Sequence, residues 1–581
     1  MIRTLAQEIK EYKKDSIMTP VFMLLEVAME MMIPLLMVRI IDDGVEKGQL
    51  TTILKVGLIM LAASGVGLYA GIMGGKYGAS ASAGFAKNLR KAMFRNIQTF
   101  SFENIDKFSS ASLITRLTTD VTNLQNSYQM ILRIGARAPA SLIVAMIISF
   151  SINARLATIY LWAAVILAAF MTMVTAVAKK LFELIFKRYD ALNASVEENV
   201  SGIRVVKAYV REQFEAAKFK LSVGELYKMF IKVERILVGV MPFAMAMIYS
   251  CILLISWRGA HLIVAGSLTT GELVSMLTYC MNILMSLMML SMIFVMVTMS
   301  VASAERITEV LREKPTITNP PEPVMTVPDG SVDFLHVDFA YDKNSVEYAM
   351  TDVTLRIESG ETIGIIGGTG SSKTTLVNMI SRLYDAKNGM VRVGGIDVKK
   401  YDLDVLRGEV SVVLQNNVLF SGSILDNLRW GNPDATDEEC EKACRQACAD
   451  EFIEKLPDGY DTYIEQGGTN VSGGQRQRLC IARALLRKPK VLILDDSTSA
   501  VDTTTDAKIR RAFREEIPGT TKIIIAQRIS SIQDADRIIV LDEGRVNGIG
   551  THEELLETNA IYRDVYESQT GSSTADFDEE A

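Results

Sequence analysis

The sequence predicts a protein of two domains, an all-α polytopic membrane domain with six long helices followed by an α/β domain. Three observations predict this fold class. Apolar runs of membrane-spanning length recur in the first half, short apolar runs alternate with helical stretches in the second half, and the two halves differ in charge. Of the 581 residues, 49% are hydrophobic and 22% are charged, which excludes a single soluble globule, a disordered chain and a collagen-like fibre. Residues 1–320 carry 33 Lys and Arg against 23 Asp and Glu, whereas residues 321–581 carry 28 against 45. The acidic second half argues against a nucleic-acid partner, which requires a basic surface.

Changes in composition along the chain predict the domain boundaries. Five prolines between residues 315 and 328 cannot sustain a helix and indicate a stiff linker. Six cysteines are too few for a disulfide framework. We expect a cytosolic N-terminal lead-in over residues 1–16, a transmembrane domain over 17–314, a Pro-rich linker over 315–331, an α/β domain over 332–570 and an acidic disordered tail over 571–581.

Six apolar runs are expected to cross the membrane. A helix needs about 20 apolar residues to span a bilayer core of about 30 Å, and one run is short unless it begins nearer Ile131. The lead-in has no apolar run and does not resemble a cleavable secretory signal. The expected spans are residues 17–37, 53–74, 138–150, 157–177, 236–257 and 273–301.

Basic residues predict the orientation of these spans. The connections 76–137 and 179–235 hold nine and twelve Lys and Arg, whereas the short turns near residues 42–49 and 151–155 hold one each. The long connections and both termini are therefore expected in the cytosol, with the protein in a cell (plasma or inner) membrane. Helical periodicity continues through residues 88–97 and 191–219, so we expect the helices to extend beyond the bilayer and to end in reversals that contact another domain.

Two features inside the spans are candidates for solute binding. Glu26 and Glu30 are four residues apart, hence on one helix face, and ionisable groups at membrane depth are costly. They either contact the solute or merely face water or a polar partner. A methionine stripe on the last span either forms a flexible multispecific wall or serves ordinary packing. It comprises Met281, Met285, Met288, Met289, Met292, Met296 and Met299, of which Met285, Met289, Met292 and Met296 are the candidate solute contacts.

The first strong motif of the α/β domain is a glycine-rich loop between the apolar strand 362–366 and a helix expected to begin near Thr375. Backbone amides and a helix N-terminus at such a loop bind phosphate, a lysine adds positive charge, and a hydroxyl binds Mg²⁺. Ser372 stands where this motif normally has glycine. A close approach of the loop backbone to the phosphate is therefore in doubt at this residue. The loop reads Gly367, Gly368, Thr369, Gly370, Ser371, Ser372, Lys373, Thr374.

Two further motifs belong to the same domain. The buried strand 491–494 ends in Asp495 and Asp496, which places carboxylates at the sheet edge near the loop's Mg²⁺. Between the two phosphate-site elements, Ser472, Gly473, Gly474 and Gln475 begin a helix expected to run to about residue 485. Exposed amides at a helix N-terminus form a second anion site.

From about residue 17 to 565, these motifs and their order resemble the ATP-binding cassette (ABC) transporters, specifically half-transporter exporters with a six-helix domain fused to one P-loop ATP-binding cassette domain. The resemblance implies ATP and Mg²⁺ as cofactors and coupling helices near residues 102–108 and 205–215. It also implies roles for individual residues. For the nucleotide, it implies that Tyr341 stacks on adenine and that residues 367–375, including Thr374 and Thr375, bind phosphate. For the metal, it implies that Asp495 lies beside Mg²⁺ and that Gln415 joins Mg²⁺ to the membrane domain. It also implies that Ser472 to Gln475 form the signature motif and that Ser499 to Asp502 form the D-loop.

Two departures from the family pattern concern catalysis. Asp496 stands where the family has a catalytic glutamate, and its side chain is shorter by one methylene. Gln527 stands where the family has a switch histidine, and an amide cannot carry an imidazolium's charge. Either these are tolerated substitutions in a working ATPase, or the site binds ATP and hydrolyses it poorly.

The second interpretation predicts a heterodimer. Cassettes of this family pair head to tail, and the intact signature motif would complete the site of a second half-transporter that supplies the glutamate and histidine. The predicted function is export of drug-like compounds, lipids or peptides by alternating access. Alternatives are a nucleotide-gated channel or regulator, and an importer. Cys440, Cys444 and Cys448 are expected to form an ordinary helix face rather than a metal site.

Overall fold

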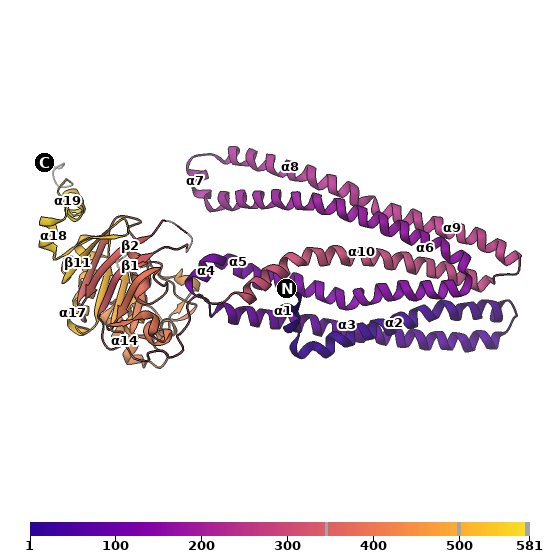
Figure 1. Ribbon diagram of the computed structural model, residues 1–581, viewed down its shortest axis with the longest axis horizontal. Helices are drawn as coiled ribbons and strands as arrows, with labels where there is room; N and C mark the ends of the chain where they lie inside the picture. The colour runs from indigo at the N-terminus through magenta and orange to yellow at the C-terminus, as the bar shows by residue number, and fades with distance from the viewer. Residues whose placement is uncertain (343–344, 346, 497–500, 576–581) are drawn as a thin grey trace. The chain divides into compact units, whose positions relative to one another are not determined.

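The computed structural model describes residues 1–342, 345, 347–496 and 501–575. The chain forms two compact units (Figure 1). The membrane unit comprises Met1–Gln98 and Ser109–Glu313, and the cassette unit comprises Thr99–Phe108 and the residues from Lys314 onward. This architecture is the predicted one, a helical polytopic membrane domain and an α/β domain.

The membrane unit is a bundle of long helices, with α8 and α9 continuing one another (Figure 1). Apart from the short segments η1 (Lys10–Tyr12), η2 (Ile40–Val45) and η3 (Arg116–Asp120), its helices are α1 (Ile2–Gln7), α2 (Lys13–Arg39), α3 (Leu50–Ile97), α5 (Ser110–Thr115), α6 (Val121–Ser201), α7 (Ile203–Ala208), α8 (Glu212–Val238), α9 (Val240–Val264) and α10 (Thr270–Arg312).

All six expected spans lie in helices. Five helical stretches among the described residues are long and apolar enough to cross a membrane, and one of them, Ser110–Ala178, holds the third and fourth expected spans. Helix α6 is interrupted between these two at Asn153, whose backbone is extended with φ −153° and ψ 103°. The Asn153 side-chain oxygen accepts a hydrogen bond from the amide of Leu156 at 3.1 Å, as an N-cap does. Because α5 and α7 flank α6 and lie at the same end of the bundle (Figure 1), the two halves of α6 are antiparallel.

The helices extend well beyond the apolar runs, as the periodicity predicts. The reversals expected near residues 102–108 and 205–215 contain the short helices α4 (Phe102–Phe108) and α7, the second beginning two residues earlier than expected. The membrane unit has a core of its own, in which Tyr279 is fully buried and donates to the Met31 carbonyl at 2.6 Å. The helices therefore carry their reversals on a packed scaffold.

The cassette unit is built on a six-stranded sheet in the order β12-β11-β3-β10-β9-β6, parallel except for β12. A four-stranded antiparallel sheet, β2-β1-β4-β5, and the pair β7-β8 complete its strands. The strands are β1 (Val332–Phe339), β2 (Met350–Ile357), β3 (Thr362–Gly367), β4 (Asn388–Val393), β5 (Ile396–Asp397), β6 (Val410–Val413), β7 (Gly422–Ser423), β8 (Tyr463–Ile464), β9 (Val491–Asp495), β10 (Thr521–Ile525), β11 (Arg537–Asp542) and β12 (Arg545–Gly550).

Helices pack on the sheets over two apolar clusters. One cluster joins β1, β3 and α11, and the other lies beneath α14, α16 and α17. The helices are α11 (Lys373–Ile380), α12 (Leu403–Glu409), α13 (Ile424–Arg429), α14 (Asp437–Gln446), α15 (Asp450–Ile453), α16 (Gly473–Leu485), α17 (Thr503–Glu516), α18 (His552–Thr558) and α19 (Ala560–Ala575). The first five residues of the expected tail belong to α19, and residues 576–581 lie outside the described residues.

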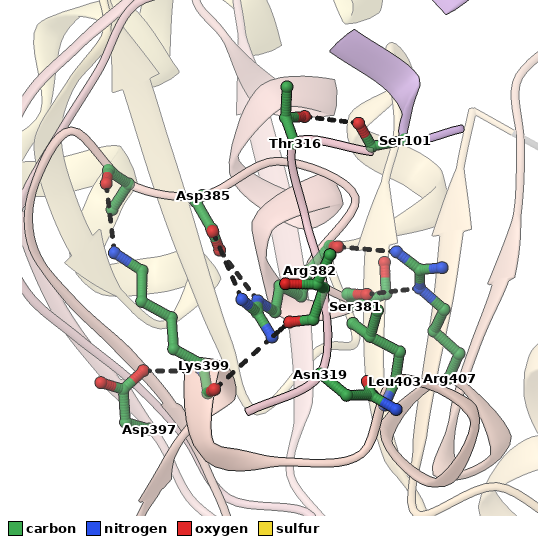
Figure 2. Close-up of polar contacts among 12 residues, drawn as sticks. Ser101, Thr316, Asn319, Ser381, Arg382, Asp385, Asp397, Lys399, Leu403 and Arg407 are labelled. Atoms are coloured by element: carbon green, nitrogen blue, oxygen red, sulfur yellow. Dashed lines mark hydrogen bonds and ion pairs between the residues drawn. The ribbon is translucent and has the colours of Figure 1, made fainter. Parts of the chain in front are cut away.

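The segment after α10 is fixed to the cassette unit by hydrogen bonds (Figure 2). Ser101 contacts the Thr316 hydroxyl at 2.5 Å, and the Leu403 amide donates to the Asn319 side chain at 3.0 Å. Helix α4 belongs to this unit as well, since the Tyr384 hydroxyl donates to Asp106 at 2.6 Å. Within the segment expected to form a stiff linker, Thr316 and Asn319 are thus hydrogen-bonded to other parts of the cassette unit.

An ion pair between a buried carboxylate and a half-exposed guanidinium joins η3 to the part of α10 beyond the expected span. Asp120 is 1% exposed; the Arg306 guanidinium donates to it at 2.7 and 2.5 Å and the Ser303 hydroxyl at 2.9 Å. Burial opposes ionisation of Asp120, yet these donors hold its pKa below the ordinary value. The pair therefore stabilises the fold above the carboxylate's unfolded pKa, and that contribution is lost as the pH falls through the lowered folded pKa.

We predict that Asp120→Asn destabilises the membrane unit by about 1–3 kcal/mol, because it removes charged hydrogen bonds from a buried group. Thermal unfolding of the purified protein in detergent measures this. Asp43→Asn, which breaks the exposed Lys47–Asp43 pair of 2.6 Å, is the matched control and should change stability by less than about 0.5 kcal/mol. Equal effects of the two substitutions would contradict a stabilising role for the hydrogen bonds to Asp120.

Candidate functional site

The parallel strands bring the sequence motifs to one edge of the sheet. In register, Ile525 of β10 lies between Ile365 of β3 and Asp495 of β9. The loop after β3, the carboxylates after β9 and Gln527 after β10 therefore meet at the carboxyl ends of neighbouring strands. This edge is where ligands bind in open parallel sheets.

The glycine-rich loop has the backbone that its sequence predicts. A Cβ on Gly367 would collide with the Leu541 carbonyl oxygen, and Gly370 has φ +84°. Ser372 also lies in the left-handed region, at φ 69°, and its hydroxyl donates to the Ala349 carbonyl at 2.6 Å. The Ser372 side chain is therefore bound to the segment before β2, and its amide still precedes the first turn of α11. Thr369 and Ser371 complete the loop, in which the Ser371 amide donates to the Gly368 carbonyl at 3.3 Å.

Lys373 is held over this loop by the loop's own oxygens. Its ammonium donates to the carbonyls of Gly367 and Gly368 at 2.9 and 2.8 Å and to the Ser371 hydroxyl at 3.3 Å. Burial lowers the pKa of Lys373, while the carboxylates of Asp495 and Asp496 act in the opposite direction. The ammonium is thus a partly buried positive charge at the mouth of the loop, where a phosphate would bind.

Asp495 ends β9 and is 2% exposed. Burial raises the pKa of this carboxyl, as does neighbouring Asp496, whereas the Thr374 hydroxyl and Lys373 lower it. Among the described residues no three His, Cys, Asp or Glu side chains are arranged to hold a metal ion. A hydroxyl and a single buried carboxylate are nevertheless the donors that suit Mg²⁺ when phosphate and water supply the other oxygens. Thr374 and Asp495 fit that arrangement, and Gln415 contacts the adjacent Asp496.

The three residues proposed for catalysis meet at Asp496. The Gln527 side-chain amide donates to the Asp496 carboxylate at 2.7 Å, and the Gln415 amide approaches the same oxygen at 3.5 Å. Asp496 is 9% exposed and adopts φ 49°, a backbone region in which aspartate is one of the tolerated residues. One carboxylate oxygen is therefore engaged by two amide donors at the position where the motif requires a proton acceptor.

The predicted second anion site begins α16. Ser472 is its N-cap, its hydroxyl accepts from the Gln475 amide at 3.3 Å, and the Gln475 side chain accepts from the Ser472 amide at 2.9 Å. This reciprocal capping leaves the first-turn amides of Gly473 and Gly474 without a helical acceptor. The N-terminal end of the helix, which carries a partial positive charge, is therefore available to an anion.

Tyr341 and Asp502 lie on different elements of the cassette unit. Tyr341 is 53% exposed, its hydroxyl contacts Thr375 at 2.8 Å, and its ring packs edge-on against Phe339 and Tyr384. The ring is thus fixed beside α11 with room for a flat partner. Asp502 caps α17 by accepting from the Thr505 amide at 2.9 Å. Ser499 and Ala500 of the expected D-loop lie outside the described residues.

In the membrane unit, Glu26 and Glu30 share one cation. The Arg137 guanidinium contacts Glu26 at 3.0 Å and Glu30 at 2.9 Å. All three line a cavity of about 480 Å³ together with Arg133 and residues of α2 and α3. The structure thus gives both acids the polar partner that sequence analysis left open. It also adds two arginines not singled out from the sequence, although Arg133 and Arg137 repeat the four-residue spacing of the glutamates.

Much of the methionine stripe forms an exposed face of α10, whereas Met288 packs against the core of the membrane unit. Met281, Met285, Met289 and Met292 are between 42% and 62% exposed, and Met296 is half-buried. The side chain of Met299 lies outside the description. In contrast, Cys440, Cys444 and Cys448 are buried beside α16, and burial raises the pKa of the Cys444 thiol to about 12. These cysteines serve packing, as expected.

Gln569 of α19 has a role that the sequence motifs did not predict. Its side-chain oxygen accepts from the Ile529 amide at 2.9 Å, and its side-chain nitrogen donates to the Gln527 carbonyl at 2.8 Å. The C-terminal helix therefore holds both sides of the loop that carries Gln527. No motif marks this residue, because the contact joins positions about forty residues apart through a side chain and two main-chain groups.

Comparisons with known proteins agree with this geometry. Residues 16–288 match the family model of the ABC transporter transmembrane region, and residues 350–499 match the ABC transporter model. The chain is 37% identical over 557 residues to the uncharacterized ABC transporter ATP-binding protein YfiB of Bacillus subtilis, covering 95% of this chain and 96% of that one. It is 36% identical over 381 residues to the probable multidrug resistance ABC transporter ATP-binding/permease protein YheI of the same organism, covering 66% and 65%. The structure of a bacterial Atm1-family ABC exporter with ATP bound has the same fold, with a TM-score of 0.80, 23% identity and coverage of 96% and 98%.

Ser372 is predicted to be compatible with nucleotide binding, because its side chain is bound to Ala349. Titration with a fluorescent ATP analogue should give Ser372→Gly an affinity within about twofold of the unmodified protein. Ser372→Val should bind at least about fivefold more weakly, since a β-branched residue is strained at positive φ. A tenfold gain in affinity for Ser372→Gly would instead identify Ser372 as a defect of the loop.

Arg137 is predicted to stabilise the membrane unit by neutralising two acids. Arg137→Met should cost about 1–3 kcal/mol, because Glu26 and Glu30 lose their shared partner at membrane depth. The triple variant with Glu26→Gln and Glu30→Gln should recover most of this stability. Thermal unfolding in detergent measures both, and no recovery in the triple variant would contradict the neutralising role.

Proposed function

The chain belongs to the ABC transporter family, and on this premise we propose that it is one subunit of an ATP-driven exporter. It would move hydrophobic or amphipathic solutes such as drug-like compounds, lipids or peptides out of the cytosol or the inner leaflet. The exporter-type fold and the fusion of a membrane domain to one cassette support this direction of transport. Both termini would lie in the cytosol, as the basic connections between spans indicate.

The hydrogen bond of 2.7 Å between Gln527 and Asp496 is the observation that supports slow ATP hydrolysis at this chain's own site. A general base must reach the water that it activates, and the aspartate is one methylene shorter than the family's glutamate. Its oxygen is, in addition, engaged by a neutral amide where the family has an imidazole. We infer that this site binds ATP and hydrolyses it slowly.

Nucleotide binding itself relies on residues that fit the task. Lys373 and the loop amides bind phosphate, Tyr341 stacks on the base, and Thr374 and Asp495 with Gln415 hold Mg²⁺, which offsets phosphate charge when bound. The residues of this chain thus bind and orient the nucleotide, while the proton acceptor is the weak element. The weak proton acceptor, Asp496, would by itself make ATP turnover slow.

The signature motif supports a heterodimer. Ser472 and Gln475 cap each other and leave the Gly473 and Gly474 amides for a phosphate. This end of α16 would complete the active site of a second half-transporter that carries the family's glutamate and histidine. A homodimer would contain two slow sites, so hydrolysis mainly at the other chain's site is the arrangement that gives a working pump.

The solute would meet the exposed face of α10 and the cavity beside α2. Flexible thioethers suit varied apolar ligands, and a relative of similar sequence carries the name of a probable multidrug resistance transporter. Since Arg137 pairs with Glu26 and Glu30, the charge of the two acids is offset and gives no preference for a cationic solute. ATP closure would turn this cavity from inside to outside, because nucleotide binds the closed state more tightly than the open one.

The test restores the family's residues. In the purified pair, Asp496→Glu with Gln527→His should raise ATP turnover at this chain's site by at least about tenfold, within the range that a well-placed general base contributes. ATPase activity is measured in a partner variant whose own site is inactivated. The matched control, Asp434→Glu with Gln533→His, makes the same chemical changes at exposed positions away from the site and should have no effect. Unchanged turnover in the restored variant would contradict the proposal.

A further inference from the structure

A second polar cavity lies at the opposite edge of the six-stranded sheet, where β3 and β10 begin. It has a volume of about 250 Å³ and is lined by Thr362, Arg510, Phe513, Arg514, Lys522 and Asp534, among others. Phosphate-loop chemistry takes place where β3 ends, so this cavity is separate from the nucleotide site. None of the sequence motifs includes its residues.

Lys522 is the unusual residue of this cavity. It follows Thr521 at the start of β10 and is only 3% exposed. Strand alternation places it on the same face as Ile524, beneath α17. Among the described residues its ammonium makes no hydrogen bond and no ion pair, although burial lowers its pKa and Asp536 acts in the opposite direction. The lysine side chain is thus largely removed from water with Asp536 as a nearby opposite charge, and an anion bound in the cavity would stabilise it further.

The acids around the cavity are already engaged. Asp534 accepts from the Arg510 guanidinium at 2.9 Å, and Asp536 accepts from the Thr362 amide at 2.7 Å. Arg514, at the exposed end of α17, likewise has no hydrogen bond or ion pair in the described part of the chain. Two cations from two elements, Lys522 of β10 and Arg514 of α17, therefore face one small cavity beside a third cation, Arg510.

We propose that this cavity binds a tetrahedral oxyanion of the phosphate class through Lys522, Arg514 and Arg510. Its volume of about 250 Å³ falls below the roughly 300–1,000 Å³ of pockets for drug-sized ligands, so it accommodates one phosphate group and not a whole nucleotide. Guanidinium groups donate to such oxygens in pairs, and the lysine adds a point charge. The ligand is either free phosphate or the phosphate group of a monoester.

The site lies between two segments that lead to the nucleotide site. Asp506 of α17 accepts from Arg510 at 3.2 Å and from Ser531 of η7 (Ile529–Ser531) at 3.1 Å. Helix α17 begins after Asp502, and η7 follows Gln527. A bound anion would hold α17 against β10 and thereby limit movement of both segments. This inference does not depend on slow hydrolysis or on a heterodimer.

The test measures equilibrium binding of radiolabelled inorganic phosphate to the purified full-length protein carrying Lys373→Ala, which removes phosphate binding at the glycine-rich loop. We expect saturable binding in which one phosphate per chain depends on this cavity, apart from any phosphate held at the start of α16. Lys522→Met, of similar shape, should weaken it at least about tenfold, and Arg514→Gln, at an exposed position, at least about threefold. Lys508→Met and Arg511→Gln are matched controls, since these exposed cations of the same helix pair with Glu451 and Glu515, and they should leave binding unchanged.

Absence of saturable binding, or binding that survives both Lys522→Met and Arg514→Gln, would overturn the proposal. Competition with glycerol 3-phosphate identifies the source of the ligand. If glycerol 3-phosphate displaces the labelled phosphate, the site binds phosphomonoesters. If it does not, the site binds free phosphate. Both results support an oxyanion site. Thermal unfolding of every variant reports whether the fold is retained, and Arg514→Gln remains decisive if Lys522→Met is unstable.

Discussion

The chemistry of the cassette depends on the parallel pairing of β3, β10 and β9. Each strand is buried, and their register fixes which residues emerge together at the carboxyl edge. Asp495 and Asp496 emerge from β9, the phosphate loop from β3 and Gln527 from the segment after β10. A shift of one residue in any strand would turn these side chains to the other face of the sheet. The same pairing of strands therefore determines both the stability of the sheet and the geometry of the site.

Within that constraint, the proposed slow hydrolysis depends on the identity of two side chains, Asp496 and Gln527. The backbone around Asp496 and Gln527 is well supported, by the Ile525 carbonyl on one side and by Gln569 on the other. The fold has thus not degraded where catalysis is expected to be weak. The proposed loss is chemical, confined to a proton acceptor and its partner, while phosphate binding and the capped signature helix are retained. This pattern suits a subunit that uses nucleotide to set a conformation and contributes α16 to another active site.

Much of the cassette follows from local sequence. Strand β1 begins at Val332, where the α/β domain is expected to start, and Ser472 is the N-cap of α16, as its motif indicates, with reciprocal hydrogen bonds to Gln475. The reversal at Asn153 was also expected, from a short polar turn between two apolar runs. Contacts between distant segments were not predictable. Arg137 contacts Glu26 and Glu30 from another helix, and Gln569 of the last helix contacts the loop that carries Gln527. The Ser372 side chain donates a hydrogen bond to Ala349, outside the glycine-rich loop. Such contacts depend on tertiary packing, and local patterns carry no signal for them.

The most direct measurement of the central claim identifies the nucleotide that this chain retains during transport. The co-purified pair would turn over a photoreactive radiolabelled ATP, be crosslinked by light, and be separated into its two chains. The account predicts that label on this chain is mainly ATP and that label on the other chain is largely ADP. Predominantly ADP on this chain, at the rate of the overall reaction, would contradict it, because Asp496 with Gln527 would then support full hydrolysis.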